Sequence, residues 1–247
     1  METHLLGEPA PTAPQGGIYT HLRIDLTNGE PIAPQLIRTL REAIVTARIK
    51  PGEMLSEQEV AKTLGVSRQP VREAFINLRD LGLIRVFPQR GTQVTKISVR
   101  AVEDARFIRE AIECAIVRDA ANKAEVLDIY RLRDSLTLQR QQVDRLDTKS
   151  FFFVDEDFHR LLASTARRPS AWDVVEMVKP QLDRVRFLVI DDFHTEQINV
   201  DEHARIVEAV ESHAPDAAEQ VMRSHLSRTS KMMLHLRESK PEMFEDA

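Results

Sequence analysis

From Val99 to Ala247, a stretch of 149 residues, the sequence shows helical periodicity and no strand pattern. Turn and capping residues mark boundaries between helices at Pro169-Ser170, at Asn199 and at His213-Ala214-Pro215. The apolar spacing predicts about six helices, near residues 101–121, 125–146, 149–166, 171–190, 199–212 and 215–237. A stretch of this length buries enough apolar surface for a single core. We therefore expect residues 99–247 to form an all-helical bundle.

The preceding segment, residues 31–98, mixes helical and strand signals. Apolar spacing predicts a helix over residues 33–47, and a capping box from Ser56 to Glu59 predicts a second helix to Leu64. Ser67 caps a third helix that continues to about residue 81, and residues 84–87 and 92–94 have the pattern of a β-hairpin. Two helices joined by a short turn and followed by a hairpin are the plan of a winged helix-turn-helix domain. The predicted fold class is therefore mainly α.

Charge is distributed unevenly between these two parts. Residues 31–98 contain 11 Lys and Arg against 6 Asp and Glu, whereas residues 99–247 contain 22 against 29. A basic module followed by an acidic one is typical of a nucleic-acid-binding domain joined to a domain of another kind. Ahead of both, turn-forming Gly and Pro in residues 1–30 predict a flexible arm, in which residues 18–26 alternate enough for a short ordered extended segment.

Composition excludes several classes of protein. The sequence has no run of about 18 apolar residues, so it predicts no membrane-spanning helix, and its polar, proline-broken N-terminus excludes a secretory signal. Its single cysteine, Cys114, cannot form an internal disulfide, which favours a cytoplasmic protein. Only 8 glycines in 247 residues argue against a glycine-rich nucleotide-binding fold.

The start of the third predicted helix carries side chains that suit DNA. Ser67, Arg68 and Gln69 form its first turn, and Arg72 follows one turn later on nearly the same side as Arg68. Helix N-terminal amides and a serine hydroxyl favour phosphate, while Arg and Gln make bidentate contacts to guanine and adenine edges. These four residues are therefore the candidates for contacts in the major groove.

The tip of the predicted wing adds a second candidate contact. It contains Gln89, Arg90 and Gly91, and a glycine there lets the backbone approach the minor groove or a phosphate closely. The alternative is a winged helix whose surface arginines are merely solvated. Because the arginines coincide with the recognition helix and the wing tip, double-stranded DNA is the favoured partner.

Three of the eight histidines stand in a pattern that suits a metal. Asp155 and His159 are four residues apart and project from one helix face, while His203 and His225 each lie on another predicted helix beside apolar positions. One carboxylate and three imidazoles suit a divalent ion such as Zn²⁺ or Ni²⁺. Asp157 is the less suitable acid because its offset from His159 places it on another face. The alternative is that these are ordinary core or surface histidines.

The N-terminal motifs resemble the GntR family of bacterial transcription regulators. The resemblance covers residues 33–96 and includes the segments 49–57, 64–74, 82–85 and 90–94, which read IKPGEMLSE, LGVSRQPVREA, GLIR and RGTQV. It implies that Ser67, Arg68, Gln69, Arg72 and Gly91 face operator DNA. Some members have a basic residue where this chain has Gln58, so a contact at that position does not transfer.

The C-terminal part resembles the FCD ligand-binding domain of the FadR-like GntR subfamily. The matching segments are residues 102–121, the Asp155-x-x-Phe-His segment, Glu202-His and Ser224-His-Leu. The resemblance implies that Asp155, His159, His203 and His225 bind a divalent cation, which helps to hold a small carboxylate effector. Where many relatives have a Gly-Asn pair, this chain has Arg-Arg-Pro at residues 167–169, so no role is carried over from that loop.

A carboxylate effector beside the metal needs cationic partners. The candidates are Arg106 and Arg109 on the first predicted helix of the bundle, and Arg184 and Arg186 further along the chain. Of these we favour Arg109 and Arg184 as the effector-binding pair. The alternative for each is a surface arginine.

Together these features predict a ligand-responsive DNA-binding regulator and not an enzyme. It would act as a homodimeric repressor of a catabolic operon, binding a palindromic operator and sensing a sugar acid or hydroxy acid. One alternative is a DNA-binding regulator whose metal is purely structural. The other is a metal-dependent hydrolase, which gives no reason for the arginines at the start of the recognition helix.

Overall fold

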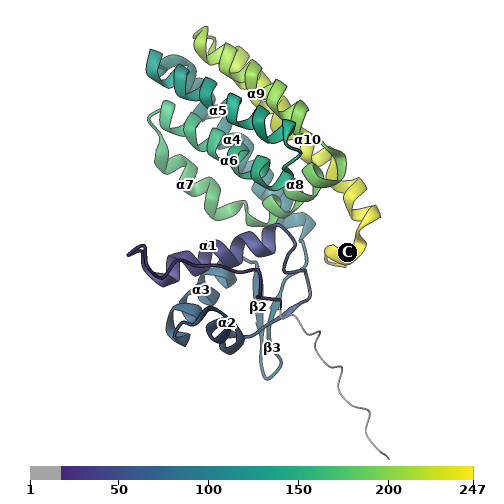
Figure 1. Cartoon of the computed structure of the whole chain (residues 1–247). Helices are drawn as coiled ribbons and strands as arrows, with labels where there is room; N and C mark the ends of the chain where they lie inside the picture. The colour runs from purple at the N-terminus through teal and green to yellow at the C-terminus, as the bar shows by residue number, and fades with distance from the viewer. Residues whose placement is uncertain (1–17, 247) are drawn as a thin grey trace, which may run out of the picture.

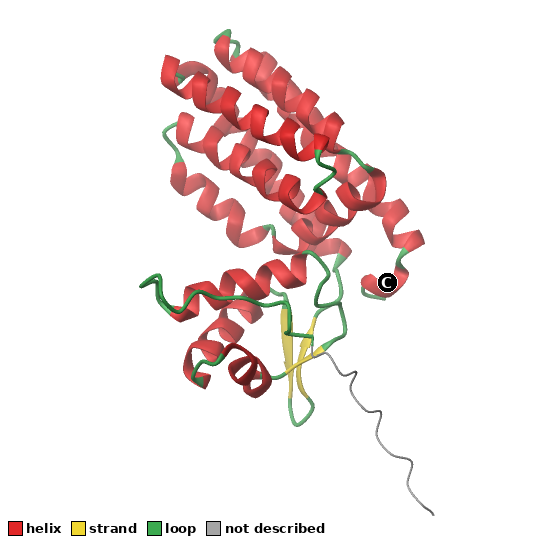
Figure 2. Cartoon of the chain, in the orientation of Figure 1, coloured by secondary structure: helices red, strands yellow, loops and turns green. Residues whose placement is uncertain are grey.

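The structure is a computed structural model that describes residues 18–246, apart from the side chains of Phe193 and Ser230. It has two parts, a small mixed domain and a larger helical bundle that packs beside it (Figures 1 and 2). The smaller part contains α1 (Ile32–Val45), β1 (Met54–Leu55), α2 (Glu57–Leu64), α3 (Arg68–Asp80), β2 (Ile84–Phe87) and β3 (Gly91–Val94). The bundle contains α4 (Val99–Lys123), α5 (Val126–Asp144), α6 (Thr148–Thr165), α7 (Pro169–Val178), α8 (Pro180–Phe193), α9 (Glu196–Glu211), α10 (Pro215–Ser239) and the 3₁₀ turn η1 (Pro241–Met243). The predicted mainly α fold class is confirmed.

Local signals fix the helix-turn-helix. The Ser56 side chain accepts a hydrogen bond from the Glu59 amide and begins α2. Gly65 ends that helix in the left-handed conformation, with φ of 67°, as a helix C-terminus commonly requires. Val60 on α2 and Val71 and Leu78 on α3 are fully buried between the helices and α1.

The wing is a three-stranded antiparallel sheet in the order β1-β3-β2. The predicted hairpin pairs Ile84 with Val94 and Phe87 with Gly91. The two-residue strand β1 was not predicted, because a strand this short has no alternating pattern to detect. Gly91 has a φ of 98°, and a Cβ atom there would lie 3.0 Å from Met54 Cε, so this position requires glycine.

The segment before α1 differs from the prediction of a loose arm up to residue 30. Tyr19 and Leu22 lie in the core of the small domain, and the Tyr19 hydroxyl accepts a hydrogen bond of 2.8 Å from the Ser56 amide. Residues 18–21 form a turn and residues 22–25 have no strand structure, so the extended segment predicted over 18–26 is also wrong. Residues 1–17 of the predicted arm lie outside the described residues.

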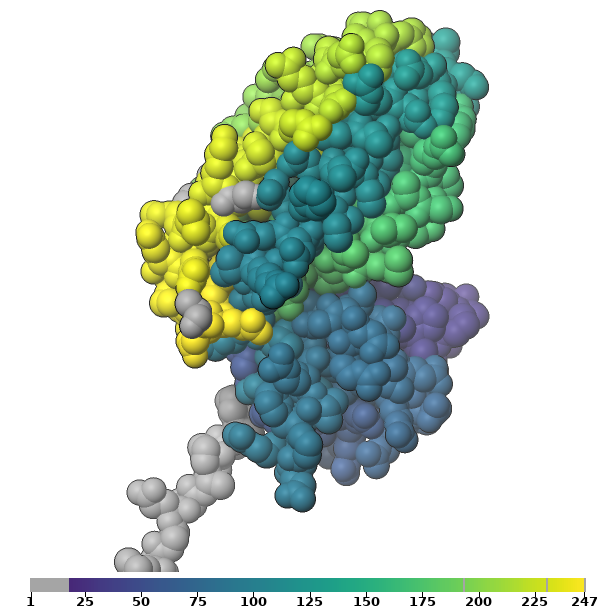
Figure 3. All heavy atoms as spheres, turned by 180° about the vertical axis from the view of Figure 1, so that it is seen from behind, coloured from purple at the N-terminus to yellow at the C-terminus, as the bar shows by residue number. Residues whose placement is uncertain are grey.

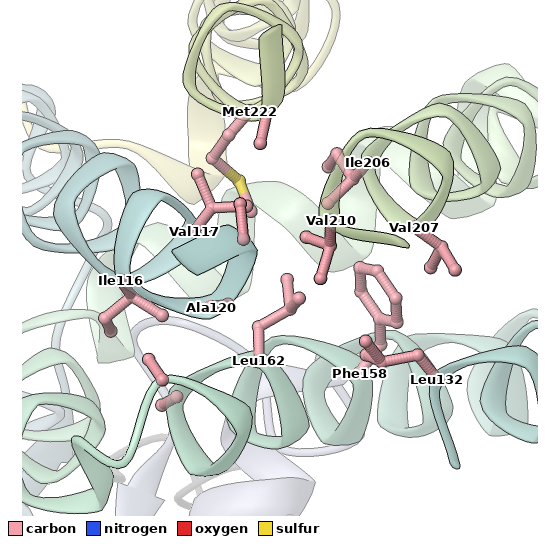
Figure 4. Close-up of a cluster of buried hydrophobic side chains, with 14 of the residues drawn as sticks. Ile116, Val117, Ala120, Leu132, Phe158, Leu162, Ile206, Val207, Val210 and Met222 are labelled. Carbon is pink, nitrogen blue, oxygen red and sulfur yellow. The ribbon is translucent and has the colours of Figure 1, made fainter. Parts of the chain in front are cut away.

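The bundle buries a core between α4, α5, α6, α9 and α10 (Figure 4). Its centre contains Val117 from α4, Phe158 and Leu162 from α6, and Val210 from α9. The described part of this region has seven α-helices, and not about six, because the helix predicted over 171–190 is divided between α7 and α8. Pro180 at the start of α8 has no amide hydrogen to continue the ladder of α7. None of the described helices is long and apolar enough to cross a membrane.

Candidate functional site

The structure brings together the four side chains singled out as metal ligands. Asp155 and His159 come from α6, His203 from α9 and His225 from α10, and all four are buried. One potential ligand atom from each residue lies within 4.8 Å of those of the other three. Asp157 is exposed and pairs with Arg160, so it takes no part. We call these four residues the quartet.

Each histidine of the quartet is held by an oxygen on the far side of its ring. The three Nδ1 contacts are His159 with Glu113 Oε2 at 2.6 Å, His203 with Gln139 Oε1 at 2.7 Å and His225 with Glu202 Oε2 at 2.8 Å. An amide or carboxylate oxygen accepts a hydrogen bond, so the contacts of His203 and His225 place the proton of each ring on Nδ1. The Glu113 carboxylate beside His159 Nδ1 favours the same tautomer, although the contact does not have hydrogen-bond geometry. Each Nε2 therefore presents a lone pair toward the centre of the quartet, as a metal-ligating imidazole must.

These Nε2 atoms lack suitable partners among the described residues. The Nε2 atoms of His203 and His225 lie 3.3 Å apart, and with both protons on Nδ1 they face each other as two acceptors. His159 Nε2 is buried without a hydrogen-bond partner, and Asp155 places a carboxylate oxygen 3.7 Å from His203 Nε2. A cation at their centre would satisfy all four groups, so the quartet fits a divalent metal ion.

The protonation states support the same interpretation. Burial lowers the pKa of His203 well below its usual value, and it lowers the pKa of His225 to about 4. Both rings are therefore neutral near pH 7, the form that binds metal. Burial alone would raise the pKa of Glu113, but Arg109 and His159 beside it hold that pKa well below the usual range, so Glu113 stays ionised.

A small polar cavity adjoins the quartet. Its wall includes Asp155 and His225 together with three guanidinium groups, from Arg109 on α4, Arg186 on α8 and Arg228 on α10. The remaining lining residues are Val189, Ile190, Thr195, Asn199, Leu226 and Thr229. Each guanidinium already pairs with a carboxylate: Arg109 with Glu113, Arg186 with Asp155 and Arg228 with Glu202. An anion in the cavity would share these guanidinium groups with the acids, and the amide and hydroxyl groups beside them suit an anion that also forms hydrogen bonds.

Arg109, which lines this cavity, has an unpartnered donor. Arg109 is 4% exposed and pairs with Glu113 through its Nε atom, but its Nη2 atom is buried and has no hydrogen-bond partner among the described residues. A buried guanidinium nitrogen without an acceptor is costly. A carboxylate oxygen in the cavity would satisfy it.

The structure does not bring Arg184, the other arginine favoured for the effector, to this cavity. Arg184 does not line the cavity; its Nη1 atom donates a 2.9 Å hydrogen bond to the carbonyl of Thr95, at the end of the wing. Arg186, two residues later, points to the other side of α8 because two residues advance a helix by about 200°. Arg106 instead pairs with Glu110 on the surface of α4, so Arg109 and Arg186 line the cavity.

The predicted DNA contacts lie on one exposed surface. Ser67, Arg68, Gln69 and Arg72 are all exposed at the start of α3, and the Ser67 side chain makes no capping hydrogen bond. Gln69 donates a 3.0 Å hydrogen bond to Glu73.

The wing tip is also free of the bundle. Arg90 and Gly91 are exposed, and the β2–β3 hairpin projects away from the bundle (Figures 1 and 3). The bundle therefore does not cover the wing tip, which remains accessible to DNA.

Comparison with known proteins identifies both parts of the chain. The profile of "Bacterial regulatory proteins, gntR family" matches residues 32–94, and the FCD domain profile matches residues 104–228. The HTH-type transcriptional repressor RspR of Escherichia coli K12 is 40% identical over 217 residues, which cover 88% of this chain and 95% of that protein. An uncharacterized HTH-type transcriptional regulator of Streptomyces ambofaciens is 34% identical over 88% of this chain and 92% of its own length.

Solved structures show the same fold. The structure of E. coli McbR/YncC matches with a TM-score of 0.74 at 17% sequence identity, covering 83% of this chain and 98% of that chain. At this identity the likeness concerns the fold alone.

Proposed function

Since the chain belongs to the gntR family of bacterial regulatory proteins and carries an FCD domain, we propose that it is an effector-controlled repressor that binds operator DNA as a homodimer. It is a transcriptional regulator and not an enzyme. RspR is named a transcriptional repressor, which supports repression for this chain as well. A two-fold dimer would match a palindromic operator.

The operator-binding surface comprises the start of α3 and the wing tip. Its residues are Ser67, Arg68, Gln69, Arg72, Arg90 and Gly91, all of which are exposed. Arg68 and Arg72 would carry base recognition in the major groove, because guanidinium groups pair bidentately with guanine. Arg90 would contact the backbone or the minor groove beside it. In domain terms, residues 31–98 bind DNA and residues 99–247 bind the effector and the partner subunit.

The quartet would hold a divalent cation, with Zn²⁺ or Ni²⁺ the best match to three imidazoles and one carboxylate. Such an ion supplies a positive charge that attracts an anionic effector. Arg109, Arg186 and Arg228 would orient a carboxylate, and Asn199 and Thr229 would bind hydroxyl groups. We therefore propose a small hydroxylated carboxylate, such as a sugar acid or a hydroxy acid, as the effector. The cavity of about 20 Å³ has room for about one water molecule, so its walls would move apart to admit the effector. The unpartnered Arg109 Nη2 beside the quartet carries this proposal.

The effector proposal is tested by thermal unfolding with a panel of sugar acids, hydroxy acids and dicarboxylates. Protein stripped with a chelator and protein reloaded with Zn²⁺ are compared. An anion at about 100 times its dissociation constant stabilises the folded state by roughly 2.7 kcal/mol. We expect a panel member to raise the melting temperature of the reloaded protein and to leave the stripped protein unchanged.

Two variants on the same helix make the test specific. Arg228→Met removes a cavity arginine, whereas Arg223→Met removes an exposed arginine that pairs with Glu110 and Glu219. The anion should fail to stabilise the first variant and should stabilise the second as it does the parent. A panel without any stabilising anion would contradict the effector proposal and would favour a regulator whose metal is purely structural.

A further inference from the structure

A continuous row of buried charges connects the anion cavity to the DNA-binding domain. It contains three acids, Asp155, Glu156 and Asp183, and three bases, Lys179, Arg186 and Arg41. We call these six residues the ionic chain. Five belong to the bundle, and Arg41 lies on α1 of the DNA-binding domain. The ionic chain therefore crosses the boundary between the two domains.

The contacts run without interruption from one end to the other. Arg186 donates through Nη2 to Asp155 of the quartet, and through Nη1 to Glu156 and to Asp183 Oδ1, the last at 3.2 Å. The other oxygen of Asp183 accepts from Lys179 Nζ at 2.7 Å and from Arg41 Nη2 at 3.2 Å. Lys179 also donates to Glu156.

Stability alone does not account for six charges in this position. The five side chains from the bundle are at most 9% exposed, and that of Arg41 is 25% exposed. Buried ion pairs lose much of their attraction to desolvation, and well-packed apolar residues are often as stable. Three positive and three negative groups balance one another, so a change in the partners of one group alters the partners of its neighbours.

Arg186 connects the quartet and its cavity to the ionic chain. It lines the cavity, and it shares Asp155 with the histidines of the quartet. A cation at the quartet would draw the Asp155 carboxylate away from Arg186, and an anion in the cavity would compete with Asp183 for the same guanidinium. Either event would change how strongly Asp183 pairs with Arg41.

We propose that the Asp183–Arg41 ion pair transmits occupancy of the quartet and its cavity to the DNA-binding domain by changing how α1 packs against α8. This inference rests on the proposed function of the quartet. A ligand shifts the placement of the domains only by the difference in its affinity for the two arrangements. Asp183 supplies that difference because it contacts both Arg186 and Arg41.

Other contacts between the domains bypass the cavity and provide controls. Gln181 and Arg184 donate to the carbonyls of Gly82 and Thr95, and neither lines the cavity. Lys149 Nζ pairs with Glu42 on α1 at 2.7 Å, outside the ionic chain. Lys149→Met therefore removes an ion pair between the domains without touching the proposed route.

The test uses full-length protein, Zn²⁺ as the ligand and an operator duplex selected from random DNA by the parent protein. The dissociation constant for the duplex is measured for stripped and Zn²⁺-loaded protein, and the ratio of the two is the response. Zn²⁺ per chain is counted separately. We expect a parent response of about fivefold or more.

Arg41→Met keeps the apolar stem of the side chain and removes its charge. We expect this variant to bind as much Zn²⁺ as the parent but to show a response close to 1, while Arg41→Lys retains part of the response. Arg38→Met, which removes an exposed arginine one turn earlier on α1, and Lys149→Met should retain the parent response.

Two outcomes would overturn the inference, and they are distinguishable. If the parent responds and Arg41→Met responds equally, the Asp183–Arg41 pair does not transmit occupancy, whatever the quartet binds. If the parent binds no Zn²⁺, the proposed function of the quartet fails, and this inference fails with it.

Discussion

Gln139 holds the proton of His203, a proposed metal ligand, on the Nδ1 atom. Replacing Gln139 by leucine tests whether this hydrogen bond prepares His203 for the metal. Gln139 is fully buried on α5, and its Oε1 accepts the His203 Nδ1 proton at 2.7 Å. Without this acceptor the ring is free to move its proton to Nε2, where it would block metal binding. Loss of such a supporting contact typically weakens metal binding 10- to 100-fold, which corresponds to about 1.4–2.7 kcal/mol.

The folded state should tolerate Gln139→Leu. The Nε2 atom of Gln139 is buried and has no hydrogen-bond partner among the described residues, so the substitution removes an unsatisfied donor as well as a hydrogen bond. Loss of the acceptor for the buried His203 Nδ1 costs about 1–3 kcal/mol, and removal of the unsatisfied donor offsets part of it. We therefore expect the free energy of unfolding of metal-stripped protein to fall by no more than about 1–3 kcal/mol.

The assay is a competition titration of Zn²⁺ against a chromophoric chelator at pH 7.5. Gln141→Leu, two residues later on the exposed side of α5, is the matched control. It should keep the parent affinity. Parent affinity in Gln139→Leu would refute the argument that the Nδ1 acceptors prepare the quartet for a metal.

Three further predictions address the other parts of the molecule. Arg68→Ala and Arg72→Ala should each weaken operator binding by about 1–3 kcal/mol in a fluorescence anisotropy titration, and unchanged affinity in both would contradict the assignment of α3 as the recognition helix. Gly91→Ala should lower operator affinity, because the new Cβ meets Met54 Cε at 3.0 Å and φ is 98°; a variant with parent affinity would show that the wing tip makes no contact with DNA. Metal-stripped protein should lose stability toward urea as the pH falls from about 6.5 to about 4. In the unfolded state His203 and His225 bind protons at their usual pKa of 6.5, whereas burial lowers both pKa values in the folded state. A free energy of unfolding that stays constant over this pH range would contradict the neutral buried imidazoles.

Short-range signals were sufficient to predict the helix-turn-helix and the β2–β3 hairpin. The Ser56 cap, the turn at Gly65 and the hairpin residues lie within a few positions of the structure they determine. The four-residue spacing of Asp155 and His159 likewise placed both on one face of α6.

Contacts between distant segments could not be predicted in this way. Glu113, Gln139 and Glu202 support the quartet, but no spacing pattern marks them, because each comes from a helix whose placement depends on packing. That Arg186 and not Arg184 lines the cavity could not be predicted for a related reason. Residues 180–190 of α8 are buried on every side, so apolar periodicity does not show which face meets the cavity. Pro180 was also overlooked, although a proline at the first position of a helix commonly starts a new one.

In the proposed function, the quartet and its cavity control operator binding. The most direct test measures the operator dissociation constant of stripped protein, of Zn²⁺-loaded protein, and of Zn²⁺-loaded protein with the anion that stabilises it. We predict that the anion raises this constant about fivefold or more in loaded protein and has no effect on stripped protein. The same dissociation constant in all three states would contradict the claim.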